Sequence, residues 1–547
     1  MSQPEHRIHV STPRGETSLV FESGTTLLDI LSTGGFALRS ACGGNAVCGL
    51  CQVRVAEHAS IPFTRGERLR LSGAQLSDGV RLACQLVPAA DLHVSIEDPV
   101  AHMAWRPLRD DEYSTPALPH EPQEAAVRYG IAIDLGTTHI RLTLWDRVKR
   151  ERLAGKTGLN PQASYGADVL TRLMEASHSQ AAAGEIGGLV RRAIAEALAG
   201  IAAQTAVQLC EVGKVTVVGN TAMLTLLSGK NYAELLQPEN WTRPIDCQPH
   251  DTNFLRDAWG LNRDADIRLI APLGGFIGSD LLAAVLATRL VEQPAGSLLI
   301  DFGTNSEMAL WDGSTLHVTS AAGGPAFEGS GISCGMPGEA GAIFRVQQNS
   351  GGFAVRVLGE TAPQGVCGSG LVDAVAWLCR NGKLDKVGQF TDHESTGFIL
   401  HEGEHRIALL HSDIDVLQRA KAAIGGGVGW LCEQAGMALS DLHRVYACGA
   451  FGHLLDVDNA QQIGLLPPVG AGEVRLESNA ALAGCEMLLL SAAAERTLNA
   501  VLTRSKVYNL AEDAAFESLF VNNLYLQPMQ VSDSNPLARL RDNQRLG

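Results

Sequence analysis

The sequence predicts two folds in one chain: a small α+β domain over residues 1–98 and a large two-lobed α/β body over residues 129–547. Three observations lead to this prediction. The first hundred residues carry a hairpin signal, a short helix and returning strands, a pattern typical of a compact α+β domain. A proline-rich stretch interrupts the pattern over residues 99–128. Beyond it, helical segments alternate with short apolar strands, and one strand–turn–strand sequence occurs twice.

The elements of the first domain follow from local signals. Alternating apolar and polar residues predict strands, and the turn Pro13-Arg14-Gly15 joins the first two of them. Gly34-Gly35 ends the only helix expected there. The expected strands cover 6–11, 16–22, 52–56 and 92–97, and the expected helix covers 25–33.

The remaining chain divides into a linker and two half-domains. Residues 99–128 contain five prolines and many charges without a helical or strand period, which predicts a linker. The first half of the body is expected to run from about 129 to 290 and the second from about 291 to 547. Helices are expected over 184–203, 280–290, 370–380 and 413–433, and strands over 130–134, 214–218, 297–301 and 444–448.

Composition excludes several classes of protein. The chain has 547 residues, of which 45% are hydrophobic and 19% charged, so it can bury large cores and is not globally disordered. Its net charge of −16 disfavours a nucleic-acid binder, which needs a basic face. No apolar run approaches the ~18 residues of a membrane span, and the polar N-terminus has no signal-peptide core. We therefore expect a cytoplasmic protein.

Four of the twelve cysteines gather in the first domain. Cys42, Cys48, Cys51 and Cys84 supply four thiolates from one loop and one later segment, and soft thiolates bind zinc or iron–sulfur clusters. A structural zinc site usually pairs two close Cys-x2-Cys units, whereas Cys84 stands alone. The Gly- and Ala-rich loop lets backbone N–H groups approach bridging sulfides. This favours a [2Fe–2S] cluster, with zinc and unrelated cysteines as alternatives. The other eight cysteines are expected to be buried small hydrophobes.

The internal repeat predicts a phosphate site. Residues 131–146 (IAIDLGTTHIRLTLWD) and 298–312 (LLIDFGTNSEMALWD) share a strand, Asp-x-Gly-Thr, a second strand and Trp-Asp, with a one-residue gap. Backbone N–H groups and hydroxyls of such a turn can hold phosphate oxygens, while the acidic residue, Asp134 or Asp301, can hold hydrated Mg²⁺. The alternative is an ordinary hairpin turn. No P-loop and no dinucleotide-binding Gly-x-Gly-x-x-Gly sequence is present.

Both parts resemble known families. The spacing Cys42-x5-Cys48-x2-Cys51 is one residue longer than the plant-type spacing and resembles that of adrenodoxin-like [2Fe–2S] ferredoxins. This resemblance covers about residues 5–98 and implies a β-grasp fold with one-electron chemistry. The paired loops resemble the phosphate motifs of the actin, sugar-kinase and heat-shock-chaperone ATPases, whose duplicated ribonuclease H-like halves bind ATP between two lobes.

The second resemblance implies roles for particular residues. Asp134 and Asp301 would orient Mg²⁺ and water, and which of them activates the water is left open. Lys421, on the helix before a glycine-rich turn, could reach the nucleotide or be an ordinary exposed lysine. Residues 218–221 are expected to line the cleft, and the segment that begins at Cys367 is expected to open a helix able to bind an anion. The expected phosphate contacts are Gly136, Thr137, Thr138, Gly303, Thr304 and Asn305, and the expected adenosine contacts are Gly449 and Ala450.

The combination of both parts resembles the reductive activators of corrinoid proteins. That resemblance implies a [2Fe–2S] cluster, ATP and Mg²⁺ as cofactors, and reduction of Co(II) to the Co(I) nucleophile of a methyltransferase system. The implied partners are a corrinoid protein and a separate electron-donating reductase or ferredoxin, with a homodimer as the oligomeric state considered. The alternatives are a small-molecule kinase with a redox-sensing module, a redox adaptor that binds nucleotide without catalysis, and an ATP-driven donor to another low-potential acceptor.

Overall fold

The computed structural model describes residues 6–12, 15–21, 24–34, 36, 38, 49, 51–71, 73–96, 105–108, 127–166, 168–359, 361–392, 397–403, 406–449, 451 and 453–530. Within it the chain forms two compact units. One consists of Met1–Arg106, Thr137–Ile140 and Thr157–Ala197, and the other of Pro107–Gly136, Arg141–Lys156 and Leu198–Gly547.

The N-terminal region forms a five-stranded sheet in the order β2-β1-β5-β3-β4. β1 pairs antiparallel with β2 and parallel with β5, which is the mixed arrangement expected of a β-grasp domain. The helix α1 begins after Thr26, whose hydroxyl accepts the Asp29 N–H, and its apolar residues Leu27 and Leu31 are fully buried. The strands are β1 (His6–Thr12), β2 (Gly15–Phe21), β3 (Gln52–Val55), β4 (Val80–Leu82) and β5 (Leu92–Ser95), and the helices are α1 (Leu27–Thr33), α2 (Arg65–Arg70) and α3 (Gly73–Ser77).

The predicted strands and helix of this region are all present. The sequence prediction missed α2, α3 and β4, because each has fewer than seven residues and too few turns to show a period. Leu27, Leu31, Val53, Leu82 and Val94 belong to one buried core that also contains Cys51 and Cys84. The short elements between β3 and β5 therefore complete the same domain.

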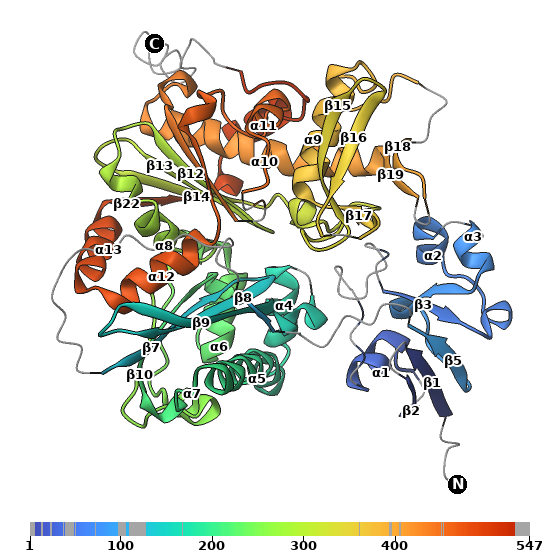
Figure 1. Cartoon of the computed structure of the whole chain (residues 1–547), viewed down its shortest axis with the longest axis horizontal. Helices are drawn as coiled ribbons and strands as arrows, with labels where there is room; N and C mark the ends of the chain where they lie inside the picture. The colour runs from blue at the N-terminus through green and yellow to red at the C-terminus, as the bar shows by residue number, and fades with distance from the viewer. Residues whose placement is uncertain are drawn as a thin grey trace. The chain divides into compact units, whose positions relative to one another are not determined.

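Two six-stranded sheets confirm the internal repeat (Figure 1). The first has the order β11-β10-β7-β8-β9-β6 and the second the order β21-β20-β12-β13-β14-β22. In both, the strand that carries the Asp-x-Gly-Thr sequence pairs parallel with a strand from later in the chain. The strands are β6 (Arg106–Pro107), β7 (Tyr129–Leu135), β8 (His139–Asp146), β9 (Glu151–Leu159), β10 (Val212–Gly219), β11 (Asp266–Leu269), β12 (Ser297–Phe302), β13 (Ser306–Trp311), β14 (Leu316–Ala321), β20 (Arg444–Gly449), β21 (Val474–Glu477) and β22 (Ser505–Tyr508).

Helices and two small sheets complete the body. The four helices predicted there are present as α5, α8, α9 and α10, each within four residues of its expected ends. The helices are α4 (Val169–Ser177), α5 (Gln180–Thr205), α6 (Thr221–Ser228), α7 (Asn253–Trp259), α8 (Ser279–Ala287), α9 (Gly368–Arg380), α10 (His411–Ala435), α11 (Val457–Gln462), α12 (Ala480–Leu490), α13 (Ala492–Arg504) and α14 (Ala514–Asn522). The small sheets contain β15 (Ala342–Asn349), β16 (Gly352–Val357), β17 (Gly365–Val366), β18 (Gly397–His401) and β19 (Ile407–Leu410).

One late helix packs against the first large sheet. α12 contacts β7, β10 and α8, although more than 180 residues separate it from each of them. A Cβ on Gly484 would lie 1.9 Å from the carbonyl oxygen of Ala283, so only glycine permits this helix crossing. The buried Glu486 carboxylate accepts hydrogen bonds from Thr143, Trp145 and Arg152 of β8 and β9. α12 therefore joins the C-terminal part of the chain to the first sheet.

The expected linker contains a short strand. Arg106–Pro107 form β6 at the edge of the first sheet, and the Leu108 N–H donates to the Gly155 carbonyl at 2.9 Å. The sequence shows no sign of this strand, because two residues are too few to show alternation, and the linker over 99–128 remains a prediction. Most of this stretch lies outside the described residues.

Candidate active site and cluster-binding region

In both copies of the repeat, the aspartate is the second-last residue of a buried strand, and a turn follows that strand. In the first, β7 carries Asp134, residues 136–138 form the turn and β8 follows. In the second, β12 carries Asp301, residues 303–305 form the turn and β13 follows. The expected strand–turn–strand geometry is therefore present twice. The phosphate contacts assigned to these turns remain predictions.

Asp134 and Asp301 belong to a cluster of five carboxylates within the larger unit. The other members are Asp280 near the start of α8, Glu307 on β13 and Glu328 in a short helical turn. Arg141 on β8 is the cation that acts on both aspartates, and its Nη1 lies 3.2 Å from the Asp134 Oδ2. Glu328 accepts a hydrogen bond from the Thr304 hydroxyl at 2.9 Å.

Burial and mutual repulsion shift the protonation of this carboxylate cluster. Burial, with the nearby Asp134 and Glu328, raises the pKa of Asp301 to about 6 against the pull of Arg141. Burial also raises the pKa of Asp134, although Arg141 opposes it. Asp280 and Glu307 have pKa values well above the usual range, because both are buried and close to other carboxylates. The site holds more carboxyl groups than cations, and a bound cation would favour their ionised forms.

Glycines allow the strand ends to approach one another at this site. Gly449 ends β20 opposite Phe302 in the parallel register, with φ +88°, and a Cβ there would lie 2.4 Å from the Asp301 Oδ1. Only glycine fits this position. The structure thus places Gly449 beside Asp301, whereas Ala450, the other expected adenosine contact, lies outside the described residues.

The expected cleft-lining segment lies at the same strand ends. Gly219 ends β10 opposite Leu135 in the parallel register, and Asn220 caps α6 through its side chain. The Gly219 N–H donates to the Ser279 hydroxyl at 3.2 Å. A Cβ on Gly278 would lie 2.5 Å from the Gly219 carbonyl oxygen, which brings the start of α8, and Asp280 with it, close to β7. Sequence reasoning missed Asp280 as a site residue.

Lys421 has a different environment from either sequence interpretation. It lies on α10 with 1% exposure, and its Nζ donates to the Tyr525 carbonyl at 2.8 Å. The expectation of an exposed helical lysine is wrong, because the C-terminal segment covers this face of α10. Burial lowers the pKa of Lys421 to about 7. Its amine contacts the chain's own backbone, and the nucleotide contact expected for Lys421 remains a prediction.

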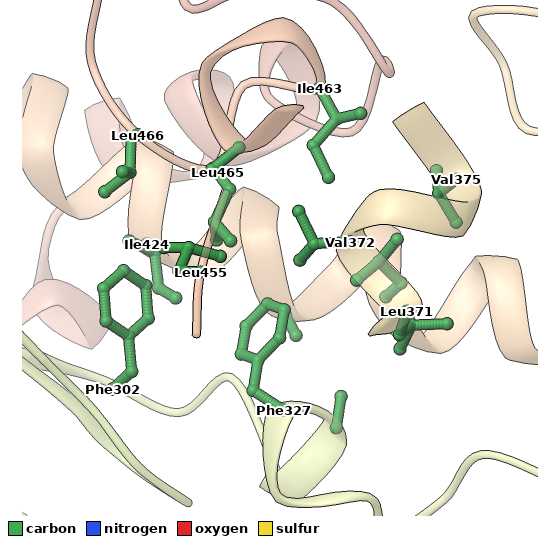
Figure 2. Packing of buried hydrophobic residues seen from close by; sticks show 14 of the residues in the cluster. Phe302, Phe327, Leu371, Val372, Val375, Ile424, Leu455, Ile463, Leu465 and Leu466 are labelled. Atoms are coloured by element: carbon green, nitrogen blue, oxygen red, sulfur yellow. The ribbon is translucent and has the colours of Figure 1, made fainter. Parts of the chain in front are cut away.

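An aromatic cluster surrounds the end of β12, next to the turn at residues 303–305. Phe302 follows Asp301, and its ring centroid lies 5.0 Å from that of Phe451 and 6.1 Å from that of Phe327. Figure 2 shows Phe302 and Phe327 facing residues of α9, α10 and the segment after α11. α9 begins at Gly368, as expected, where a Cβ would lie 2.3 Å from the Phe327 carbonyl oxygen. This segment therefore has a packing role, and its anion binding remains a prediction.

Two of the four predicted cluster ligands are described. Cys51 immediately precedes β3, and Cys84 lies in the turn after β4; their exposures are 1% and 6%. The Ala83 N–H donates to the Cys51 carbonyl at 2.8 Å, so the two ligand-bearing segments are adjacent. The Gln85 amide lies 3.9 Å from the Cys84 sulfur, a contact that can stabilise a thiolate. These residues fit a cluster site, while Cys42 and Cys48 lie outside the described residues.

The remaining cysteines follow the sequence expectation with exceptions. Cys247, Cys367, Cys432, Cys448 and Cys485 are buried. Cys334 and Cys379 are partly exposed and Cys210 is exposed, so the expectation is wrong for Cys210. Over the described ranges, no group of three or more His, Cys, Asp or Glu side chains is arranged to hold a metal ion directly. No described helix is both long and apolar enough to span a membrane.

Three family models match successive parts of the chain. A model described as the 2Fe-2S iron-sulfur cluster binding domain matches residues 11–89. A model described as the RACo middle region matches residues 129–293, and one described as the C-terminal domain of RACo, the ASKHA domain, matches residues 295–536. The N-terminal fold is therefore that of a [2Fe–2S] domain, and the chain also contains an actin-like ATPase domain, whose family model covers residues 295–536.

Similar proteins cover most of the chain. The corrinoid activation enzyme RamQ of Eubacterium limosum is 32% identical over 74% of this chain and 71% of its own length. The Methanosarcina barkeri protein named [Co(II) methylated amine-specific corrinoid protein] reductase is 28% identical over 62% of this chain and 66% of its own. The solved structure of a reductive activator for corrinoid,iron-sulfur protein has a TM-score of 0.64, 24% identity, and coverage of 96% of this chain and 99% of that one, so it shares the fold.

Proposed function

Because the chain belongs to the RACo family, we propose that it uses ATP to drive the reduction of a corrinoid protein. One electron would pass from a reduced [2Fe–2S] cluster to Co(II), and Co(I), the nucleophile of methyl transfer, would form. The observation that carries this proposal is the presence on one chain of a cluster-binding domain and an actin-like ATPase domain, in a family whose members include corrinoid activation enzymes.

The cluster-binding residues are assigned as follows. Cys51 and Cys84, with Cys42 and Cys48 from the loop before them, would hold the cluster, which supplies one-electron transfer when bound. Cys51 and Cys84 are buried, so water is excluded from their sulfurs. The reduction potential of the cluster would therefore be set in part by hydrogen bonds from the protein to these sulfurs. Gln85 is such a donor at Cys84.

The ATPase residues are assigned from the carboxylate cluster. Asp134 and Asp301 would orient hydrated Mg²⁺, and the turns at residues 136–138 and 303–305 would hold phosphate oxygens. Gly449, which lies beside Asp301, would contact the nucleotide, as the resemblance to the actin-like ATPases implies. Arg141 limits the negative charge at Asp134 before the cation arrives. Mg²⁺ would be contacted through water, in keeping with the lack of a direct metal site among the described residues.

ATP is needed because the electron transfer is uphill. A plant-type ferredoxin has a potential near about −400 mV, and we expect the Co(II)/Co(I) couple to lie lower. Each 100 mV of uphill transfer costs about 2.3 kcal/mol per electron. A nucleotide-dependent difference in affinity for the partner can supply a few kcal/mol of this cost. We propose that ATP supplies it by changing how the corrinoid partner is held.

The remaining assignments are a separate electron donor, a homodimer and a cytoplasmic location. A separate reductase or ferredoxin is proposed because the sequence has no dinucleotide-binding motif. Direct reduction of the pure chain by NADH would contradict this. Sedimentation of the full chain tests the homodimer. Fractionation of the source cells tests the cytoplasmic location, which a thiolate-ligated cluster favours because that compartment is reducing.

One experiment tests the proposed function. The anaerobic, cluster-loaded full chain is photoreduced with 5-deazariboflavin and mixed with the Co(II) corrinoid protein of a methyltransferase system. The cobalt absorption spectrum is then followed with ATP, without ATP and with a non-hydrolysable ATP analogue. We expect Co(I) with ATP and little without it. Equal cobalt reduction without nucleotide, or ADP formation with no cobalt reduction by any corrinoid protein, would contradict the proposal.

A further inference from the structure

The helix α2 presents an arginine-rich face to solvent. Arg65, Arg68 and Arg70 are exposed, and Leu69 between them is 71% exposed. Among the described residues, none of these three arginines forms an ion pair. We call Arg65, Arg68, Leu69 and Arg70 the arginine face. Positive charge with an exposed apolar residue at its centre is a composition suited to binding an acidic protein surface.

The arginine face lies beside the cluster-binding loop. A Cβ on Gly49, which stands between Cys48 and Cys51 in the sequence, would lie 3.3 Å from the Cβ of Arg70. Leu71, directly after α2, is buried in the same core as Cys51 and Cys84. A protein bound to this face would therefore contact the chain next to the cluster ligands.

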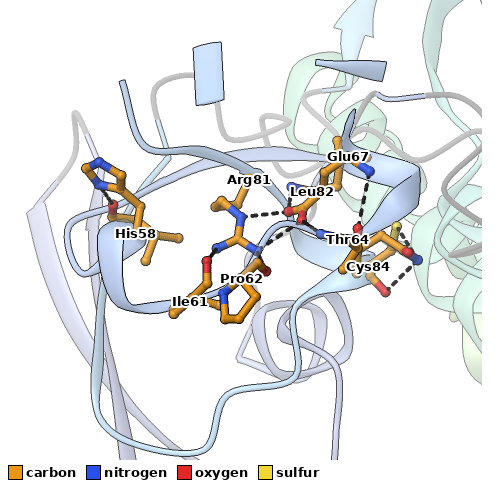
Figure 3. Close-up of polar contacts among 10 residues, drawn as sticks. His58, Ile61, Pro62, Thr64, Glu67, Arg81, Leu82 and Cys84 are labelled. Atoms are coloured by element: carbon orange, nitrogen blue, oxygen red, sulfur yellow. Dashed lines mark hydrogen bonds and ion pairs between the residues drawn. The ribbon is translucent and has the colours of Figure 1, made fainter. Parts of the chain in front are cut away.

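A buried ion pair fixes α2 to the segment that carries Cys84 (Figure 3). Arg81 donates from Nε to Glu67 Oε1 at 2.7 Å and from Nη2 to Glu67 Oε2 at 3.0 Å, and both side chains are essentially unexposed. Glu67 Oε1 also accepts the Leu82 N–H at 3.1 Å, two residues before Cys84. Because Glu67 occupies the inner side of α2, these charge-assisted hydrogen bonds hold the helix with the arginine face against the segment that carries Cys84.

The arginine face contrasts with the charge of the rest of the chain. Residues 1–98 contain ten acidic residues, eight arginines and no lysine. The remaining 449 residues contain 49 acidic and 35 basic residues and would repel an acidic partner. Both parts are net negative, so an acidic protein would be attracted by the local positive charge of the arginine face and not by the net charge of either part.

We propose that the arginine face docks an acidic surface of the redox protein that reduces the cluster. This inference rests on the proposed function and names one of its partners. A six-residue helix offers a small contact area, typical of the transient complexes through which electron carriers turn over. On docking, one electron leaves the partner and enters the cluster, and no bond forms or breaks.

The test uses the anaerobic full chain and a flavodoxin of strongly negative net charge as the probe. Binding is measured by fluorescence anisotropy of dye-labelled oxidised flavodoxin, and cluster reduction by stopped-flow mixing with fully reduced flavodoxin. The variants are Arg68→Glu, Arg65→Glu/Arg68→Glu and the charge-preserving Arg65→Lys/Arg68→Lys. The matched control is Arg7→Glu, a charge reversal at an exposed arginine of β1 in the same domain.

We expect the double charge reversal to lower both the affinity and the second-order reduction rate about tenfold or more at low salt. High salt should remove most of the difference between the double charge reversal and the unmodified chain. Arg65→Lys/Arg68→Lys and Arg7→Glu should keep the affinity and the reduction rate of the unmodified chain. Equal effects of Arg7→Glu and Arg68→Glu would overturn the inference, as would flavodoxin binding that none of the variants changes.

Photoreduction distinguishes failure of this docking inference from failure of the proposed function. Photoreduction by 5-deazariboflavin bypasses the donor, so the charge-reversal variants should still give Co(I) with ATP and a normal cluster spectrum. If they lose that step while flavodoxin binding is unchanged, the arginine face binds the corrinoid protein, and our assignment of the electron donor is wrong. If the unmodified photoreduced chain gives no Co(I), the proposed function fails whatever flavodoxin does.

Discussion

Replacing Arg81 by methionine should destabilise the N-terminal domain by several kcal/mol. Arg81 donates four hydrogen bonds: two to Glu67, one to the Ile61 carbonyl at 3.2 Å and one to the Pro62 carbonyl at 3.0 Å. Methionine keeps much of the side-chain volume but leaves the Glu67 carboxylate buried without its cation. Removing one partner of a buried pair costs about 3–5 kcal/mol, a large part of the ~5–15 kcal/mol that stabilises an ordinary domain.

The assay is anaerobic scanning calorimetry of the cluster-loaded full chain, with iron release followed in parallel. A loss of about 4 kcal/mol corresponds to roughly 15–30 °C in the melting temperature of a domain of this size. Arg68→Met, on the exposed side of the same helix, is the matched control and should change stability by less than about 0.5 kcal/mol. Glu67→Leu/Arg81→Met removes both charges and should recover much of the loss.

The stability difference between the unmodified chain and Arg81→Met should also depend on pH, which gives a second check. Burial alone would raise the pKa of Glu67, but hydrogen bonds from Arg81, Thr64 and Leu82 outweigh it and hold the pKa below 4.5. Stability from the pair is therefore present above about pH 4.5 and is lost as the pH falls through the lower pKa of the folded state. A loss under about 1 kcal/mol for Arg81→Met, or a double variant no more stable than the single one, would refute the reasoning.

Three further predictions concern the two sites and the C-terminal half. Cys51→Ser should abolish cobalt reduction while ATP binding, measured by calorimetry, persists, whereas Asp134→Ala should keep a reducible cluster but lose ATP binding and, with it, ATP-dependent cobalt reduction; cobalt reduction by both variants would contradict the assignments. Asp301→Asn should stabilise the body by up to about 3 kcal/mol above pH 6, because the pKa of Asp301 is raised to about 6 and its charge is costly there, yet it should abolish ATP hydrolysis. Burial lowers the pKa of Lys421 to about 7, so between about pH 7 and 10 the unfolded chain binds one more proton than the folded chain. Chemical denaturation should show the unmodified chain gaining about 1.4 kcal/mol per pH unit over Lys421→Met in this range, and parallel pH profiles would exclude this role.

The sequence was informative where a chemical pattern is local. Two strands joined by Asp-x-Gly-Thr are recognisable in each copy, and the structure contains them at β7–β8 and β12–β13. The strand that ends at Gly449 was also predicted, because its apolar run is followed directly by glycine. In each case the residues that define the element are neighbours in the chain.

The rest of the site could not be predicted, because it depends on how distant segments pack. Asp280 begins an apolar helix, and only the approach of Gly278 to Gly219 brings it near Asp134. Lys421 has the sequence context of an ordinary helical lysine, and its burial depends on a segment about a hundred residues later. The raised pKa of Asp280 and the burial of Lys421 are properties of the tertiary structure.

The two copies of the repeat also differ in a way that accounts for the charge of the site. Counted back from the shared Trp-Asp pairs, Arg141 and Glu307 occupy the same position, four residues before Trp145 and Trp311. The first copy therefore supplies a cation beside Asp134, and the second supplies another buried carboxylate. A symmetric pair of arginines would neutralise both aspartates within the protein, whereas the observed pair leaves one arginine, Arg141, to act on both of them. Because buried carboxylates ionise only with a counter-charge nearby, this asymmetry favours a cation that arrives with the nucleotide over one built into the fold.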